Sequence, residues 1–432
     1  MKIHLIGIGG IGVSALARFL QHSGHEVSGS DIKASPITKS LEEKGIKINC
    51  PHNKSNIKDD FDFVIYSAAI KATNEELVQA CEKNIKTYSR KEALPFILGD
   101  KKVYSVCGAH GKSTTTAILA SILNSSALIG AISKDFDSNF RYVDGLLAFE
   151  ADESDGSFLL SNPYCALITN CEPEHMEHYN HDLKRFYHAY EQFISMAKIK
   201  VLNAEDDFIS SLDVKGIKLY PSKDITNISY SLKENEPFTS FVLKDLGEFE
   251  VWGFGQHIAI DASLAILAAL NEMSLVSIRK NLSSYKGIKK RFDLVQKYDD
   301  FVIIDDYAHH PTEIEATIKS TNLYAKLKNI DKIIIIWQPH KYSRLQDNLE
   351  HFKKCFKGCD ELIILPVWST GEKKIDINLE EEFKIYEPYF ADSLVTKEKS
   401  ISIQKNNKII KTYSKGIILG LGAGDITYQL RI

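Results

Sequence analysis

The sequence predicts an α/β protein organised around parallel sheets. Short apolar runs alternate with longer amphipathic stretches along almost the whole chain, which is the pattern of buried strands connected by helices. Most of these runs end in a glycine-rich or polar loop. The chain has 432 residues. At roughly 100–200 residues to a domain, that length suggests two to four domains.

The first α/β unit begins at the N-terminus. A strand over Lys2–Ile6 is followed by a glycine turn and by a helix over about Val13–His22. Two further strands are predicted at Glu26–Gly29 and Phe61–Tyr66. The segment ILGDKK, around Leu98–Lys102, interrupts the apolar pattern with Gly, Asp and two Lys, which is typical of a linker. We therefore expect a first domain at residues 1–99.

A second α/β series follows this linker. Its predicted elements are strands at Val103–Cys107, Leu146–Glu150 and Cys165–Thr169 and a helix at about Ala259–Asn271. From about Tyr220 to Phe254 the pattern is less regular, and alternating aromatic residues indicate antiparallel strands or an edge insertion. The polar stretch SSYKGIKKR marks the next boundary, so we expect a central domain at residues 100–287.

A third α/β unit is expected at residues 288–432. Apolar runs there predict strands at Phe301–Ile304, Lys332–Trp337, Glu361–Leu365 and Gly416–Leu421. Each of these runs precedes a polar or glycine-rich loop. The sequence therefore predicts three α/β units in succession.

Composition and charge narrow the range of partners. The 53 basic and 57 acidic residues give a formal net charge of −4, and no long Lys/Arg block is present, so we expect no nucleic-acid partner. Seven scattered cysteines fit a reducing compartment better than a disulfide framework. No secretory pattern opens the chain, and no run reaches the ~18 apolar residues of a membrane span. We expect a cytoplasmic protein without membrane insertion.

Gly7, Gly9 and Gly12 form G-x-G-x-x-G between the first strand and the first helix. Glycine lets backbone N–H groups approach a diphosphate, and the following helix N-terminus supplies uncompensated donors. Asp31, after the second strand, could accept a hydrogen bond from a ribose hydroxyl. NAD, FAD and a UDP-sugar would all satisfy this motif, and a tight turn needed only for helix packing is the structural alternative.

A second phosphate-binding turn is predicted in VCGAHGKSTTTAILASIL, between a strand and an amphipathic helix. In such a loop the backbone wraps the phosphates, Lys112 reaches the β/γ oxygens and the Ser113 hydroxyl joins a Mg²⁺ shell. The loop is a shortened variant, because Val106 stands where the usual spacing requires glycine. A βα turn that carries Lys-Ser by chance is the alternative.

Acidic and histidine residues follow the next two strands, in AFEADESDGSF and ITNCEPEHMEHY. Mg²⁺ prefers oxygen ligands and needs only one or two carboxylates beside phosphate oxygens. Glu150 ends a strand, where α/β sheets build their sites, and His175 could bind a second ion or accept a proton. The alternatives are a solvated acidic loop and an exposed histidine turn.

Two polar loops in the third unit also follow strands. The segment IIDDYAHHPTEIEATI carries Tyr307 and His309, and IIIIWQPHKYSR carries His340, Lys341 and Arg344. Loops at strand ends are disproportionately functional, although some are ordinary connections. The final GLGAGDI repeats the sequence of a strand followed by a glycine turn.

Taken together, these segments resemble the Mur ligases of bacterial peptidoglycan synthesis. The matching motifs run nearly end to end in the family's order: GIGGIG, GAHGKSTTT, EADESDGSF, TNCEPEHM, the KRF at Lys290–Phe292, DDYAHHPTE, QPHKYSR and GAGDI. The resemblance implies an N-terminal UDP-binding Rossmann-like domain and a central P-loop ATPase-type domain. It also implies a C-terminal Rossmann-like domain that closes over the site and receives the amino acid.

The resemblance implies roles for individual residues. For the UDP substrate the expected residues are Gly9, Gly10, Gly12, Ser14, Asp31 and Ser67. For ATP they are Gly108, Ala109, His110, Gly111, Lys112, Ser113, Thr114, His257, Arg291 and Tyr307. For the metal they are Ser113, Glu150 and His175, and for the amino-acid side His309, His340 and Arg344. The expected catalytic residues are Lys112, His175, Arg291 and His309.

The activity that the resemblance implies is an ATP-dependent ligation. The γ-phosphoryl group would pass to the lactyl carboxylate of UDP-N-acetylmuramate, and the amine of L-alanine would attack the acyl phosphate. The alternatives are a ligase that attaches a preformed murein peptide to the same sugar nucleotide, a nicotinamide-dependent oxidoreductase and a non-catalytic nucleotide-binding regulator. We expect a monomer or homodimer.

Several positions depart from the family pattern. Ile258 and Asp261 stand where asparagines are common, and Lys341 stands where arginine is usual. Replacement of that arginine removes a planar two-point contact. Ala109, Ser113 and Ala308 are smaller departures, and none of these changes removes a charge that the phosphate or metal chemistry needs.

Overall fold

The computed structural model describes residues 1–99, 101–174 and 176–432. These residues divide into two compact units. The first consists of Met1–Asn227, Phe241–Glu250 and Ala259–Lys286, and the second of Ile228–Ser240, Val251–Ile258 and Gly287–Ile432. No helix in the described ranges is both long enough and apolar enough to cross a bilayer.

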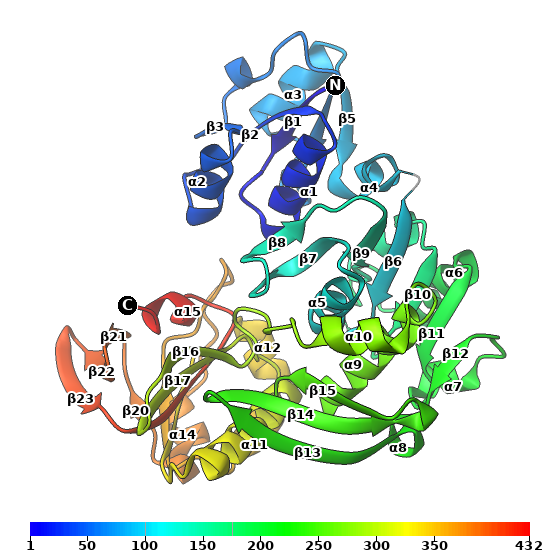
Figure 1. Ribbon diagram of the computed structural model, residues 1–432. Coiled ribbons are helices and arrows are strands. Elements are labelled where there is room, and N and C mark those ends of the chain that lie inside the picture. Colours follow the sequence, from blue (N-terminus) through cyan, green and yellow to red (C-terminus); the bar gives the residue numbers. More distant parts are fainter. Residues whose placement is uncertain (100, 175) are drawn as a thin grey trace. The chain divides into compact units, whose positions relative to one another are not determined.

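The N-terminal sheet has five parallel strands in the order β3-β2-β1-β4-β5 (Figure 1). The strands are β1 (Lys2–Ile6), β2 (Glu26–Ser30), β3 (Lys47–Asn49), β4 (Phe63–Tyr66) and β5 (Lys86–Ser89). The helices are α1 (Ile11–His22), α2 (Pro36–Glu43), α3 (Glu75–Glu82) and α4 (Arg90–Leu98). Helix α4 begins at a capping box in which Ser89 and Glu92 bond each other's backbone N–H groups. The three strands predicted in this region are confirmed.

The second sheet has seven strands in the order β12-β11-β10-β6-β9-β7-β8, and only the β7–β8 pair is antiparallel. The strands are β6 (Lys102–Cys107), β7 (Ser126–Ser133), β8 (Ser138–Arg141), β9 (Leu146–Glu150), β10 (Cys165–Ile168), β11 (Ile199–Asn203) and β12 (Ile217–Leu219). The helices are α5 (Lys112–Leu123), α6 (Leu183–Met196), α7 (Asp207–Ser211), α8 (Pro221–Asp224), α9 (Gln256–Ala269) and α10 (Leu275–Leu282). The strands and the helix predicted here are confirmed.

The first two sheets share one hydrophobic core, which the sequence did not predict. Buried residues of both sheets, among them Leu5 and Leu147, belong to a single cluster. Helix α1 packs against β7 and β8, and its Phe19 meets Phe140 edge-on with ring centroids 6.2 Å apart. This shared core explains why both sheets fall in one compact unit.

The irregular region around residues 220–254 contains the strands β13 (Ile225–Lys233), β14 (Glu236–Leu243) and β15 (Glu248–Trp252), which form a three-stranded sheet. Glu234 and Asn235 join β13 to β14 with φ values of 52° and 65°. Two residues with positive φ form the turn of an antiparallel hairpin. The prediction of antiparallel strands is therefore confirmed for this pair.

The sheet of the second unit has six strands in the order β16-β17-β24-β18-β19-β20. They are β16 (Asp293–Lys297), β17 (Phe301–Asp306), β18 (Ile333–Trp337), β19 (Glu361–Ile364), β20 (Tyr389–Phe390) and β24 (Gly416–Leu421). The helices are α11 (Pro311–Lys328), α12 (Tyr342–Asp347), α13 (Leu349–Cys355), α14 (Leu379–Glu382) and α15 (Ile426–Gln429). Every residue of β17, β18 and β24 is buried, as expected of parallel strands covered on both faces. All four strands predicted here are confirmed.

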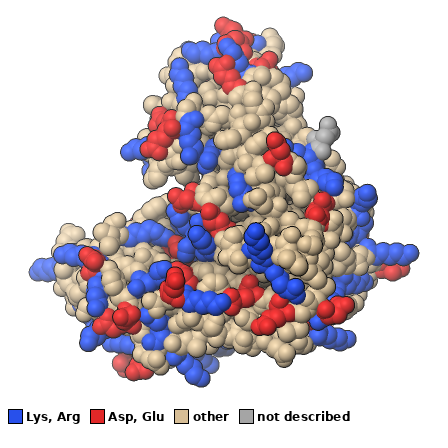
Figure 2. All heavy atoms as spheres, viewed as in Figure 1, with Lys and Arg blue, Asp and Glu red and all other residues tan. Residues whose placement is uncertain are grey.

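An antiparallel three-stranded sheet completes the second unit, with strands β21 (Ser393–Lys397), β22 (Ser400–Lys405) and β23 (Lys408–Tyr413). The sequence did not predict it. On the face shown in Figure 2, acidic and basic side chains are interspersed, in keeping with the nearly balanced composition.

Candidate active site

The first candidate site is the glycine turn between β1 and α1. Gly7 adopts φ +78°, and the N–H groups of Gly7 and Ile8 donate to the carbonyl oxygen of Ser30. The N–H of Gly9 donates to the Asp31 carboxylate at 2.7 Å. The N-cap of α1 is Gly10, which has no side chain to cap the first-turn N–H groups. The turn is thus held against the end of β2.

The other residues expected to bind the UDP substrate lie around the same sheet edge. Ser67 follows β4, and a Cβ on Gly7 would lie only 2.9 Å from the Ser67 Cβ. Ser14 is buried in the first turns of α1, and its hydroxyl donates to the Ile11 carbonyl at 2.9 Å. Parallel strands β2, β1 and β4 are neighbours, so their carboxyl ends bring these residues together.

The second candidate site is the loop between β6 and α5. Gly108 has φ +143°, and a Cβ there would lie 2.1 Å from the Thr169 hydroxyl, so only glycine fits. Gly111 has φ +80° and is the N-cap of α5, which begins at Lys112. A Cβ on Gly111 would lie 2.6 Å from Asp261 Oδ1, so this acid stands directly against the loop. Ala109, Ser113 and Thr114 lie on or next to this loop.

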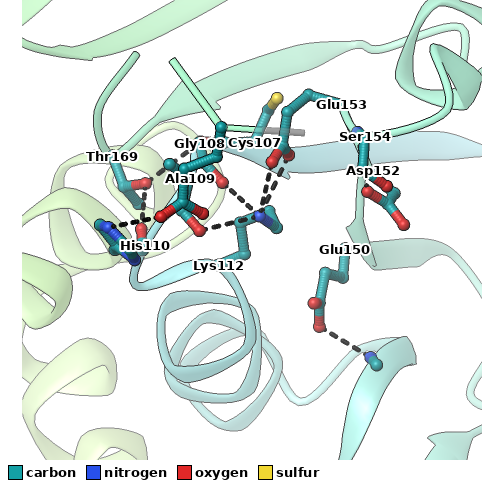
Figure 3. Close-up of polar contacts among 12 residues, drawn as sticks. Cys107, Gly108, Ala109, His110, Lys112, Glu150, Asp152, Glu153, Ser154 and Thr169 are labelled. Atoms are coloured by element: carbon teal, nitrogen blue, oxygen red, sulfur yellow. Dashed lines mark hydrogen bonds and ion pairs between the residues drawn. The ribbon is translucent and has the colours of Figure 1, made fainter. Parts of the chain in front are cut away.

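Lys112 is held inside the loop by several acceptors (Figure 3). Its ammonium donates to the carbonyl oxygens of Gly108 and, at 3.1 Å, Ala109. It also lies 3.0 Å from both carboxylate oxygens of Glu153. Burial lowers the pKa of Lys112, but attraction to Glu153 and Glu150 outweighs burial and leaves that pKa raised. The lysine is therefore a cation at the phosphate loop.

Ser113 and Glu150, two of the expected metal ligands, are in direct contact. The Ser113 hydroxyl donates to Glu150 Oε1 at 2.9 Å, and the other carboxylate oxygen accepts from the Gly130 N–H at 2.7 Å. These are oxygen donors of the kind that Mg²⁺ prefers. In residues 1–99, 101–174 and 176–432, no three His, Cys, Asp or Glu side chains are grouped to hold a metal ion by themselves.

The third expected metal ligand, His175, lies outside the described residues. The loop residue His110 is hydrogen-bonded to Thr169 and Asn170, which follow β10. The His110 carbonyl accepts from the Thr169 hydroxyl at 2.6 Å, and its N–H donates to Asn170 at 3.1 Å. Its ring lies 3.3 Å from the Glu174 carboxylate. Strand order β10-β6-β9 places these strand ends side by side.

Three further residues expected to bind ATP lie in the second unit: Arg291, Tyr307 and His257. The Arg291 guanidinium stands 5.3 Å from the centre of the Tyr307 ring and 3.9 Å from the Glu313 carboxylate. The Tyr307 N–H donates to the Lys290 carbonyl at 2.8 Å. Arg291 and Tyr307, which were each expected to bind ATP, thus lie in contact. His257 lies near the start of α9, in the same unit.

Asp306, to which the sequence had assigned no role, organises this group. Its buried carboxylate accepts from the N–H groups of Phe292 at 2.7 Å and Ala308 at 2.8 Å. Burial raises the pKa of Asp306 to about 6, although Arg291 and these two bonds lower it. The sequence signal that could have identified Asp306 is its position in a pair of adjacent acids, Asp305 and Asp306, at the end of an apolar strand. Asp306 binds the segment before β16 to the loop after β17.

His309, His340 and Arg344 form one cluster. The imidazole rings are 5.9 Å apart and nearly perpendicular, and Arg344 donates to His340 Nδ1 at 2.9 Å. Burial, with some contribution from Arg344, lowers the pKa of both histidines to about 4. Both imidazoles are therefore neutral at physiological pH. Lys341, the N-cap of α12, has φ +69° and ψ 134°, a conformation that costs energy for a residue with a side chain.

The glycine turn at the chain's end lies beside this cluster. A Cβ on Gly424 would meet Gln338 Oε1 at 2.3 Å and the Trp368 ring at 2.8 Å. Gln338 donates to Asp425 at 2.6 Å and accepts from the Ile426 N–H at 3.1 Å. Backbone bonds also connect Trp368 to Pro339 and Lys341. This network holds the loop that carries His340.

Parallel sheets with two glycine turns at strand ends, one of them carrying a lysine, define a nucleotide-binding α/β protein. Family models match two parts of the chain, "Mur ligase family, catalytic domain" at residues 2–102 and "Mur ligase, glutamate ligase domain" at residues 290–403. The chain belongs to the Mur ligase family.

Its relatives match over their full length. The UDP-N-acetylmuramate–L-alanine ligase of Campylobacter curvus is 56% identical over 431 residues, with 100% of this chain and 99% of the relative covered. The enzyme of the same name from Helicobacter pylori is 56% identical over 434 residues, with 100% and 96% covered.

A crystal structure is also similar. The UDP-N-acetylmuramate-alanine ligase of Thermotoga maritima superposes with a TM-score of 0.83 at 28% identity, covering 100% of this chain and 97% of that one. The predicted fold class is thereby confirmed as the three-domain Mur ligase architecture. The domain boundaries at 99/100 and 287/288 stay predictions.

Proposed function

We propose that this chain is an ATP-dependent ligase that joins L-alanine to the lactyl carboxylate of UDP-N-acetylmuramate in peptidoglycan precursor synthesis. The observation that carries the proposal is a pair of glycine turns on different sheets, the second of which carries Lys112 in contact with Glu153 and Ser113 in contact with Glu150. Two different nucleotides can therefore be held at once. The names of the full-length relatives support the same substrates.

The first turn would bind the UDP diphosphate. Its backbone N–H groups and the uncapped N-terminus of α1 attract an anion. The Arg90 guanidinium lies against the same turn, since a Cβ on Gly12 would meet its Cζ at 3.4 Å. The Asp31 carboxylate, besides accepting from Gly9, has lone pairs left for a ribose hydroxyl. Gly9, Gly10, Gly12, Ser14 and Ser67 would complete the contact.

The second turn would bind ATP. Lys112 would contact the β/γ phosphates, while Ser113 and Glu150 would hold Mg²⁺ together with phosphate oxygens and, by analogy within the family, His175. When bound, Mg²⁺ supplies positive charge that lowers the repulsion between the phosphates and the attacking carboxylate. By analogy within the family, His257, Arg291 and Tyr307 would also contact ATP.

Activation is needed because a carboxylate does not react with an amine at neutral pH. In the proposed cycle, the lactyl carboxylate attacks the γ-phosphorus, ADP leaves, and an acyl phosphate forms. Lys112 and Arg291 act by neutralising and aligning the two anions. The neutral amine of L-alanine then attacks the acyl carbon, and phosphate is expelled.

The amino acid would bind beside His309, His340 and Arg344. Arg344 is a cation suited to the carboxylate of L-alanine. His175 or His309 would take the proton that the amine releases. The pKa of His309, lowered to about 4, makes its neutral form abundant but its basicity weak.

Release of phosphate from ATP should depend jointly on UDP-N-acetylmuramate and L-alanine. Glycine, L-serine and a murein tripeptide serve as competing acceptors. A preference for the tripeptide would instead support the peptide ligase, and hydride transfer to a nicotinamide would support the oxidoreductase. We further propose that the enzyme acts in the cytoplasm as a monomer or homodimer, without a nucleic-acid partner or membrane insertion.

A further inference from the structure

Glu153 is a buried acid beside the phosphate loop for which the proposed reaction has no use. It lies in the turn after β9, its side chain is 1% exposed, and its carboxylate meets the ammonium of Lys112 at 3.0 Å (Figure 3). Its backbone carbonyl accepts from the Tyr179 hydroxyl at 2.5 Å, which anchors the turn to the segment before α6. The acid is therefore placed at Lys112 by tertiary structure.

The ammonium of Lys112 has three N–H donors, and its acceptors here number three as well. They are the carbonyl oxygens of Gly108 and Ala109 and the carboxylate of Glu153. A nucleotide phosphate must therefore compete for this cation. Since the carboxylate and the phosphate are both anions, their competition is electrostatic as well as geometric.

Within residues 1–99, 101–174 and 176–432, the groups that interact with Glu153 from neighbouring elements include no second cation to replace Lys112. The titratable groups that face it from neighbouring elements are Cys107, Cys171, Tyr179 and Tyr190, and burial raises the pKa of each above its usual range. Asp152, on the same turn, has a lowered pKa and is an anion. Without Lys112, an ionised Glu153 would be a buried charge beside a like charge, which is strongly unfavourable.

We infer that Glu153 is a positioning residue that holds Lys112 in the nucleotide-free enzyme and takes up one proton from solvent when Lys112 moves to the nucleotide. The carboxylate becomes a carboxylic acid, and the ammonium keeps its proton and exchanges one anionic partner for another. This inference rests on the proposed ATP site.

The direction of the pH dependence follows from linkage. Burial already raises the pKa of Glu153 to about 7, although Lys112 opposes the shift. When the Lys112 ammonium moves to the nucleotide, the pKa of Glu153 rises further in the MgATP complex. ATP affinity should therefore be greatest below about pH 7, and should fall by up to about tenfold per pH unit as pH rises toward the pKa of the complex.

The test is calorimetric titration of the full chain with MgATP, without the other two substrates. Measurement in two buffers of different ionisation enthalpy gives the number of protons taken up. We expect the wild type to take up close to one proton more than Glu153→Gln at about pH 8. The Glu153→Gln enzyme should bind MgATP nearly independently of pH and about tenfold more tightly than the wild type at about pH 8.

Asp152→Asn is the matched control, because Asp152 neighbours Glu153 but makes no ion pair with Lys112; this variant should keep the proton uptake. Equal proton uptake by wild type and Glu153→Gln would overturn the inference. So would a wild type that takes up no proton, a measurement that needs no variant to fold. Absence of MgATP binding at every pH would instead overturn the proposed ATP site.

Discussion

The carboxylate of Asp31 accepts a hydrogen bond from the backbone N–H of Gly9 at 2.7 Å, and its other oxygen accepts from Ile32 N–H at 2.7 Å. Asp31 therefore fixes the glycine turn to the end of β2. It also remains able to accept from a ribose hydroxyl, so one side chain would both shape the first nucleotide site and contact its ligand.

Replacement of Asp31 by alanine should raise KM for UDP-N-acetylmuramate by about tenfold or more, because hydrogen bonds to a charged group contribute roughly 1.5–3 kcal/mol. The kcat at saturating substrate should change little. Steady-state kinetics with each substrate varied in turn checks this. Asp59→Ala, an exposed acid of the same sheet region, is the control. An unchanged KM in Asp31→Ala would contradict the proposed contact.

Lys112→Ala should abolish ligation, since Lys112 is the lysine that the loop GAHGKS would place at the phosphates. Binding of UDP-N-acetylmuramate should stay within about twofold of wild type, because its turn belongs to a different sheet. Turnover and equilibrium binding are measured on the same preparation. Equal loss of both would show that the two phosphate sites are not separate.

Arg344→Lys should raise KM for L-alanine by about tenfold, because an ammonium cannot reproduce the planar fork of a guanidinium. KM for UDP-N-acetylmuramate should not change. Arg185→Lys, an exposed arginine on α6, controls for the substitution itself. If all three KM values rise together, Arg344 does not act on the amino acid specifically.

His309 and His340 should remain neutral from about pH 5 upward, since burial lowers the pKa of each to about 4. Neither should produce the loss of activity between about pH 7 and pH 5 that an ordinary histidine would. NMR titration of the imidazole resonances checks this, with His309→Gln and His340→Gln providing the assignments. A midpoint near the ordinary value of 6.5 for either residue would contradict the burial argument.

Glu76 is the residue for which we predict the largest effect on stability. Its fully buried carboxylate accepts from Ser30, from Asn53 N–H at 3.0 Å and from Asn56 at 2.6 Å. Burial raises its pKa, but the His4 imidazole 3.8 Å away and hydrogen bonds from Ser30 and the two asparagines outweigh burial and lower that pKa to about 2.

Because the pKa of Glu76 is depressed in the folded state, the ionised carboxylate contributes about 3 kcal/mol to the free energy of unfolding. This contribution is complete above the unfolded-state pKa and is lost as pH falls from about 4.5 toward 2. Glu76→Gln should lower the free energy of unfolding by about this amount at pH 7. Denaturant titration at neutral and acid pH measures it. Glu75→Gln changes the exposed neighbour and should have little effect.

Much of the fold could be predicted because its signals are local. Strands such as β17 and β24 are continuous apolar runs, and both glycine turns lie within a few residues of the strand and helix that they connect. The antiparallel sheet β21–β22–β23 was not predicted, because of its three short strands only β22 alternates clearly between buried and partly exposed residues. The core shared by the first two sheets depends on contacts such as that between Phe19 and Phe140, which no local pattern predicts.

The sequence by itself determined which residues end or follow strands and therefore which can meet at a sheet edge: Asp31, Lys112, Glu150, His309 and His340. Only the tertiary structure decided which of them pair. Lys112 and Glu153 are 41 residues apart, and the strand order β6-β9 brings them together. Hydrophobic periodicity specifies where a strand lies in the chain. The packing of whole sheets specifies which strands are neighbours, and neighbouring strands decide which charged side chains meet at the site.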